Sequence, residues 1–252
     1  MWEVTLLSVL QGCAEFLPIS SSGHLVLGKA LLGMGECGMR LDIFLHVGTL
    51  AAVFAFYWSV IWRIIRNLEW GYMLKVIVSA VPAGVVGILF KEELEAAFAS
   101  PQMVGAALIF TGFILTATKF IPKGTKDVSF GRAILMGLAQ AIAILPGVSR
   151  SGMTLAAARA SGVDAEKSAE FSFLMSAPPI AGAALLQILE GVKSTDLVST
   201  EVSWPLTIYG GLLAAVIGYL SLKLLIRSLK GRWFWLFGPY CLLAGVLTLV
   251  FA

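Results

Sequence analysis

The sequence predicts an all-α, polytopic integral membrane protein with six transmembrane helices and two re-entrant helical hairpins, arranged as an inverted-topology repeat. Of its 252 residues, 58% are hydrophobic and only 13% are charged, whereas soluble domains carry about 25% charged residues. Apolar stretches recur at lengths of about 20 residues, which is enough to cross a bilayer. This composition excludes a soluble enzyme, a disordered chain and a secreted disulfide scaffold.

The expected elements form one membrane domain over residues 1–252 and fall in the same order twice. In the first half, a broken apolar segment at 2–32 is followed by expected spans at 41–62, 72–90 and 102–120. In the second half, a broken segment at 131–161 precedes expected spans at 169–189, 204–225 and 235–251. Pro, Gly and Ser interrupt both broken segments, so neither half of them can cross alone. We interpret them as re-entrant helix pairs, which lipid tolerates only where they are buried in protein or line a polar cavity.

An internal repeat supports this order. A shift of 129 positions superposes four polar or small residues of the two broken segments: Gln11 on Gln140, Ser20 on Ser149, Ser22 on Ser151, and Gly23 on Gly152. We therefore divide the chain into pseudo-repeats 1–125 and 126–252, each a broken hairpin with three spans. Three spans are an odd number, so the two halves insert with opposite orientation, as in many transporters.

Basic residues predict the orientation in the membrane. If Arg63 lies inside, thirteen basic residues fall on inner loops and four on outer loops, namely Lys29, Arg40, Lys91 and Lys193. The positive-inside rule then places both termini and the mouth of the first hairpin outside. The net charge of +3 is small and scattered, so we expect no nucleic-acid partner. A homodimer is left open.

The first broken segment concentrates polar chemistry at one bend. Gln11 and Glu15 are four residues apart and share a helix face, and Pro18 ends that helix. A serine cluster after the bend is suited to cap the next half-helix. The bend thus gathers an amide, a carboxylate, three hydroxyls and an imidazole: Gln11, Glu15, Ser20, Ser21, Ser22 and His24.

The second broken segment adds a cation within the bilayer. Pro146 and Gly147 break the helix, and Arg150 follows between two serines. Ionisable groups inside a membrane are costly and by default mark function, with a partner nearby. Because the repeat puts the two bends face to face, we expect Arg150 and Glu15 to share one cavity.

Such a cavity is suited to an anion such as phosphate or diphosphate. Two half-helix N-termini direct free N–H groups and positive dipole ends at it, and the guanidinium of Arg150 matches phosphate oxygens. The phosphate-binding residues we expect are Ser20, Ser22, Ser149, Arg150, Ser151 and Gly152. Glu15 would repel the anion unless it is protonated, bridged by a metal ion or used to take a proton from a hydroxyl. A carboxylate beside a nucleophile favours phosphoryl transfer over simple binding.

These two motifs, Gln11 to His24 and Pro146 to Gly152, resemble those of the BacA-type undecaprenyl pyrophosphate phosphatases, and the resemblance extends over essentially the whole chain. It implies a cell-membrane enzyme that hydrolyses undecaprenyl diphosphate to the monophosphate, recycles the lipid carrier of cell-wall synthesis and confers bacitracin resistance. It also implies a divalent cation, Mg²⁺ or Ca²⁺. The functional positions of the family fall on Glu15, Ser21, His24 and Arg150.

Several roles are assigned on this basis. Ser21 is the expected nucleophile and Glu15 the base that accepts its proton, while His24 is an alternative nucleophile or the acid for the leaving phosphate. Arg150 is the expected phosphate clamp. The family pattern allows Glu or Gln at the first motif position, and Gln11 takes the less acidic option. The expected metal ligands are therefore Glu15 and Gln11 rather than two carboxylates.

The sequence leaves two other questions: the role of His46 and Asp42, and a competing function in transport. His46 and Asp42 lie one turn apart in the first span, and a polar contact between helices is favoured over catalysis. The competing function is a carrier or flippase for polyprenyl phosphate or another anion, which the same inverted repeat would suit. The combination of Glu15, Ser21 and His24 favours chemistry over transport.

Overall fold

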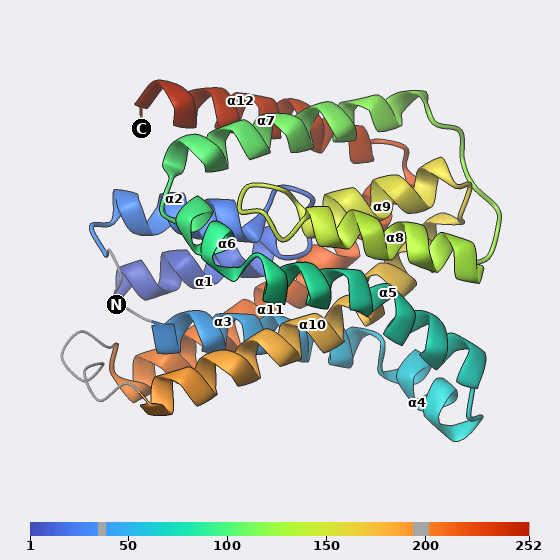
Figure 1. Cartoon of the computed structure of the whole chain (residues 1–252), viewed down its shortest axis with the longest axis horizontal. Coiled ribbons are helices and arrows are strands. Elements are labelled where there is room, and N and C mark those ends of the chain that lie inside the picture. The colour runs from blue at the N-terminus through green and yellow to red at the C-terminus, as the bar shows by residue number, and fades with distance from the viewer. Residues whose placement is uncertain (35–38, 194–201, 252) are drawn as a thin grey trace.

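The computed structural model describes residues 1–34, 39–193 and 202–251, and their regular structure is built of helices (Figure 1). The first half contains α1 (Trp2–Ala14), α2 (Ser21–Leu31), α3 (Met39–Phe56), α4 (Trp58–Arg66), α5 (Trp70–Leu89), α6 (Lys91–Phe98), α7 (Pro101–Ala117) and the 3₁₀ turn η1 (Thr118–Phe120). The second half contains α8 (Phe130–Ile142), α9 (Arg150–Ala160), α10 (Ala165–Lys193), α11 (Trp204–Lys230), the 3₁₀ turn η2 (Phe234–Leu236) and α12 (Phe237–Phe251). The all-α prediction is confirmed.

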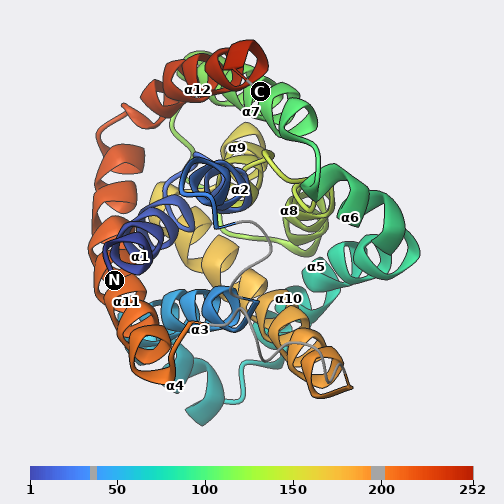
Figure 2. The same ribbon diagram turned by 90° about the vertical axis from the view of Figure 1, so that its left-hand side faces the viewer.

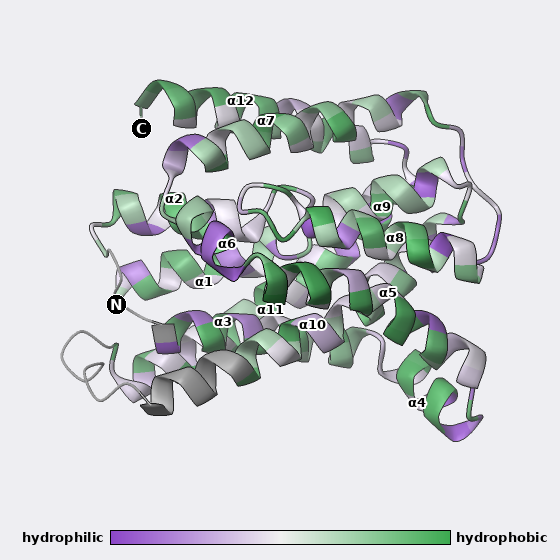
Figure 3. Cartoon of the chain, in the orientation of Figure 1, coloured by the Kyte–Doolittle hydropathy of each residue, from purple (hydrophilic) through white to green (hydrophobic). Residues whose placement is uncertain are grey.

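Several helices have the length and composition of membrane spans. Among the described residues, four qualify individually: Trp70–Leu89, Pro101–Phe120, Trp204–Lys230 and Phe234–Phe251. Only 11% to 39% of their most apolar stretches is buried inside the protein, so the apolar surface faces outward (Figure 3). The predicted span 169–189 lies within α10, where the side chains of 186–193 are outside the described part. The protein is a multi-pass membrane protein.

The predicted span 41–62 is not one straight helix. It is divided at Tyr57, and the pieces Arg40–Phe56 and Trp58–Arg66 meet at 69°, so that together they form a possible fifth crossing. The bend allows α4 to bury Ile64 while Arg63 and Arg66 stay exposed. The bend at Tyr57 therefore agrees with the amphipathic pattern of α4. The apolar composition of 41–62 alone did not indicate that the chain bends there.

The two broken segments occupy the centre of the molecule. Figure 2, along the length of the bundle, shows α1, α2, α8 and α9 surrounded by the longer helices. The pairing of helices recurs between halves, because α1 packs on α11 as α8 packs on α5, and α3 packs on α11 as α10 packs on α5. Helix α7 packs along α12. The longer helices thus flank the hairpins α1–α2 and α8–α9, while α8 keeps an exposed apolar side at Ile134, Leu135, Leu138 and Ile142.

One contact between long helices bears directly on the site. At the crossing of α3 and α11, a Cβ added to Gly48 would lie 2.1 Å from the carbonyl oxygen of Gly211. No other residue type fits this approach, and close backbone contact through small residues is how membrane helices associate. The contact sets the position of α3, which carries His46 two residues earlier.

Candidate active site

Each hairpin restarts as a helix at a serine that the sequence analysis singled out. The Oγ of Ser20 accepts a hydrogen bond from the backbone N–H of Gly23 at 3.3 Å, and the Oγ of Ser149 accepts one from Gly152 at 3.1 Å. These are the same positions of the repeat. The caps satisfy one donor at each helix start, and the remaining free N–H groups and both helix dipoles are available to an anion.

The two bends lie against each other, as the repeat predicts. The hydroxyl of Ser20 donates to the carbonyl oxygen of Val148 at 3.4 Å, and the hydroxyl of Ser151 donates to that of Leu17 at 3.3 Å. Ser20 has a φ of 73°, a conformation that costs free energy for a residue with a Cβ. The reciprocal contacts hold this strained turn, and they place the starts of α2 and α9 beside the same space.

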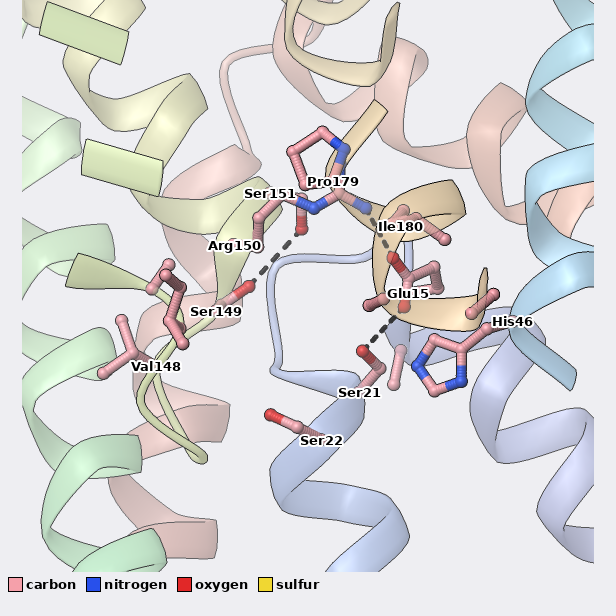
Figure 4. Close-up of a pocket in the computed structure, with 15 residues that line it drawn as sticks. Glu15, Ser21, Ser22, His46, Val148, Ser149, Arg150, Ser151, Pro179 and Ile180 are labelled. Atoms are coloured by element: carbon pink, nitrogen blue, oxygen red, sulfur yellow. Dashed lines mark hydrogen bonds and ion pairs between the residues drawn. The ribbon is translucent and has the colours of Figure 1, made fainter. Parts of the chain in front are cut away.

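A buried ion pair joins the two halves of the chain. Nη2 of Arg150, on α9, donates to Oε1 of Glu15 at 2.5 Å, with side-chain exposures of 16% and 7% (Figure 4). The other carboxylate oxygen, Oε2, accepts from Nε2 of Gln11 at 3.0 Å and from the hydroxyl of Ser21 at 2.8 Å. The expected meeting of Arg150 and Glu15 is confirmed, and Ser21 is already hydrogen-bonded to the carboxylate that could accept its proton.

Two polar atoms at this site have no hydrogen-bond partner among the described residues. They are Nη1 of Arg150 and Oε1 of Gln11, both buried. Buried polar groups are nearly always paired, so an orphaned donor or acceptor calls for an explanation. The free Nη1 of Arg150 is available to an incoming oxygen atom while Nη2 remains on Glu15.

A cavity of about 250 Å³ opens at this ion pair. Its polar wall is made by side chains from both hairpins and α3: Glu15, Ser21, Ser22, His46, Ser149, Arg150 and Ser151. Its apolar wall comes mainly from the ends of α1 and α8 and from α10: Ala14, Ala143, Ile144, Val148, Pro179, Ile180, Ala183 and Ala184. One side is therefore suited to a phosphate and the other to hydrocarbon.

The remaining predicted residues support the cavity from behind rather than lining it. Gln11 bonds to Glu15, Ser20 caps α2, and the N–H of Gly152 is used by its own cap. His24 has both ring nitrogens in use, Nδ1 with the carbonyl oxygen of Ser20 at 2.9 Å and Nε2 with the Tyr240 hydroxyl at 2.7 Å. The imidazole of His24 is thus directed toward α12.

The structure places His46 in the wall of the cavity. Asp42 does make the expected contact between helices, through an ion pair with Lys29 of α2. Within the described part of the chain, the imidazole of His46 forms a hydrogen bond with the backbone of its own helix, and it lines the cavity with Glu15 and Ser21. The available signal was that His46 is one of two histidines in the chain and lies in an apolar span. The contribution of Pro179 and Ile180 had no signal in the sequence.

The described residues of the site offer few side-chain donors to a divalent cation. The described residues contain no group of three or more His, Cys, Asp and Glu side chains that could hold a metal ion by themselves. Mg²⁺, however, is usually bound by one or two carboxylates together with substrate phosphates and water. Glu15, in the cavity wall, and the orphaned Oε1 of Gln11, buried behind it, are oxygen donors of the kind that this second arrangement would use.

The fold and the cavity define a class: a polytopic membrane protein with an anion site at the meeting point of two broken helices. Within that class the chain belongs to the family described as Bacitracin resistance protein BacA, which it matches over residues 4–247. It is similar to proteins named undecaprenyl-diphosphatase from Halothermothrix orenii (37% identity, covering 100% of this chain and 98% of the relative), Pelotomaculum thermopropionicum (39%, 100% and 97%) and Methanosphaera stadtmanae (36%, 97% and 95%).

Proposed function

We propose that this protein is a membrane phosphatase that hydrolyses undecaprenyl diphosphate to the monophosphate and inorganic phosphate. The observation that carries the proposal is the chain of contacts from the Ser21 hydroxyl to Glu15 and from Glu15 to Arg150. A carrier would need an anion site, but it would not need a hydroxyl nucleophile resting on a carboxylate. The relatives named undecaprenyl-diphosphatase support hydrolysis in the same way.

The substrate binds with its terminal phosphate in the polar half of the cavity. The free Nη1 of Arg150 and the N-termini of α2 and α9 supply donors to its oxygens, while Ser149 and Ser151, whose hydroxyls bond to each other and to Leu17, line the wall beside it. The polyprenyl chain leaves along the apolar wall of α10 at Pro179 and Ile180. Positioning and charge stabilisation account for most of the catalysis of phosphoryl transfer.

The chemistry begins at Ser21. Its hydroxyl proton passes to Oε2 of Glu15 as Oγ attacks the terminal phosphorus, and the bond from that phosphorus to the bridging oxygen breaks. Polyprenyl monophosphate leaves, and a phosphoserine remains. Water then attacks the same phosphorus, the P–Oγ bond breaks, and the proton held on Glu15 returns to the Ser21 oxygen as phosphate is released.

A divalent cation, Mg²⁺ or Ca²⁺, accompanies the diphosphate in this proposal. Glu15 and the amide oxygen of Gln11 would hold it, and the bound ion would neutralise charge on the phosphate oxygens. The Nε2 of Gln11 meanwhile keeps the Glu15 carboxylate turned toward Ser21.

The proposed location is the plasma membrane, with both termini and the mouth of the first hairpin outside. The distribution of basic residues supports this orientation. It can be tested with single cysteines introduced at the exposed residues Lys91 and Arg227, which the proposal places on opposite sides. A membrane-impermeant thiol reagent applied to intact cells should label the first position and not the second.

The activity is tested by phosphate release from undecaprenyl diphosphate with purified protein and Mg²⁺. We expect Glu15→Gln to lower the rate by about 10²–10⁴-fold, as for loss of a general base. Arg150→Ala should lower it by about 10³–10⁵-fold, as for loss of a phosphate-stabilising arginine. Wild-type protein that releases no phosphate when Mg²⁺ is supplied would exclude the proposed function.

A further inference from the structure

Ser22 and His46 are the polar groups in the cavity wall that the steps above do not use, and of the two only His46 has a nitrogen that can take a proton from water. His46 projects from α3, on a helix that belongs to neither hairpin, into the space shared by Glu15 and Ser21. Figure 4 shows its imidazole beside Ser21 and Glu15, across the site from Ser149. A histidine at this position can exchange a proton with a molecule that reacts at Ser21.

The hydrogen bonding of His46 determines which nitrogen is available. Nδ1 lies 2.9 Å from the backbone carbonyl oxygen of Asp42, and a carbonyl oxygen can only accept a hydrogen bond. Nδ1 therefore carries the hydrogen, and in the neutral imidazole the lone pair is on Nε2. No described residue forms a hydrogen bond with Nε2, so this acceptor is left for a molecule in the cavity.

The ring is also held in place. Its helix is clamped against α11 by the contact of Gly48 with Gly211, and the carboxylate of Asp42 is tied to α2 by the ion pair with Lys29. A catalytic group works only when supporting contacts restrain it near the productive geometry. His46 is restrained at both the ring and the backbone.

The second half of the reaction needs an acceptor of this kind. Once Ser21 has been phosphorylated, its proton is on Glu15, and the other oxygen of that carboxylate is occupied by Arg150. The attacking water must lose a proton to some other group. His24 does not fill this role, because both of its ring nitrogens are already engaged outside the cavity.

We propose that His46 is the general base of the dephosphorylation step. Its Nε2 takes a proton from water while the water oxygen bonds to phosphorus, the P–Oγ bond to Ser21 breaks, and the serine oxygen receives the proton from Glu15. The imidazolium then passes its proton to solvent. This inference rests on the proposed function, since it requires a phosphoserine intermediate, and it assigns the two halves of the reaction to different bases.

The test separates the two products in time. Full-length protein in detergent is mixed with undecaprenyl diphosphate and Mg²⁺, the reaction is quenched at intervals, and polyprenyl monophosphate, inorganic phosphate and phosphoserine are each measured. We expect the two products of the wild type to appear together. In His46→Ala and in His46→Gln, which retains a hydrogen-bonding side chain but cannot accept the proton, one equivalent of monophosphate should appear as a burst. Inorganic phosphate should then follow about 100-fold or more slowly, with phosphoserine accumulating at Ser21.

Matched controls make the outcome decisive. Ser21→Ala should show neither burst nor phosphoserine, and His24→Gln should slow both products together without accumulating phosphoserine. The burst itself shows that the His46 variants are folded. If they release both products in step, at whatever rate, and accumulate no phosphoserine, the assignment is overturned. If the wild type releases neither product, it is the proposed function that fails.

Discussion

Removing Arg150 should destabilise the protein mainly through the charge that it leaves behind. The Arg150 nitrogen and the Glu15 oxygen are 2.5 Å apart, and both side chains are largely buried. At that separation two unit charges attract by about 7 kcal/mol for an effective dielectric constant of about 20. Much of this is offset by desolvation, and breaking such a pair from one side costs about 3–5 kcal/mol because one charge stays buried alone.

The prediction therefore compares Arg150→Ala with the double variant Arg150→Ala, Glu15→Gln. Glutamine has the size of glutamate but no charge, so the double variant has no isolated carboxylate in the cavity. At about 2–4 °C per kcal/mol for a chain of this size, we expect Arg150→Ala to unfold about 6–20 °C below the wild type. The double variant should recover most of that loss.

Thermal unfolding of the three purified proteins in the same detergent provides the measurement, and phosphate release provides a second one. Both variants should be inactive, because neither has the phosphate clamp. A recovery of stability in the double variant is therefore not accompanied by a recovery of activity. If Arg150→Ala and the double variant unfold at the same temperature, the destabilisation does not come from the isolated charge and the reasoning is wrong.

Three other outcomes follow from the structure. Gly48→Ala should lower the unfolding temperature sharply, because its Cβ would lie 2.1 Å from the Gly211 oxygen. Gly84→Ala is the control and should not lower it, because a Cβ there has nothing within 4 Å. A Gly48→Ala protein as stable as the wild type would refute the close contact. EDTA should abolish phosphate release and Mg²⁺ restore it; activity that survives chelation would remove the cation from the proposal. Gln11→Glu places a second carboxylate by the Oε2 side of Glu15, so half-maximal activity should need less Mg²⁺, and an unchanged Mg²⁺ titration would argue against Gln11 as a ligand.

Local signals in the sequence were sufficient for much of the fold and for the core of the site. A proline and a capping serine end one helix and begin the next within a few residues, so the bends could be placed without knowing their surroundings. The same holds for Glu15, Ser21 and Arg150, whose charge or hydroxyl stands out against an apolar background. The span predicted at 41–62 is bent by 69° at Tyr57, and the sequence did not indicate the bend because the apolar content of α4 hides an amphipathic pattern.

By itself, the sequence determined that the chain is a multi-pass helical membrane protein, that two of its segments turn back at serine-capped bends, and that a carboxylate and a guanidinium are buried there. These properties depend on composition and on neighbours a few residues apart. The tertiary structure alone decided that His46 faces the cavity while His24 faces Tyr240. The directions of these two side chains depend on how α3 and α12 pack against helices that are distant in the sequence. That packing sets which way a helix directs each side chain.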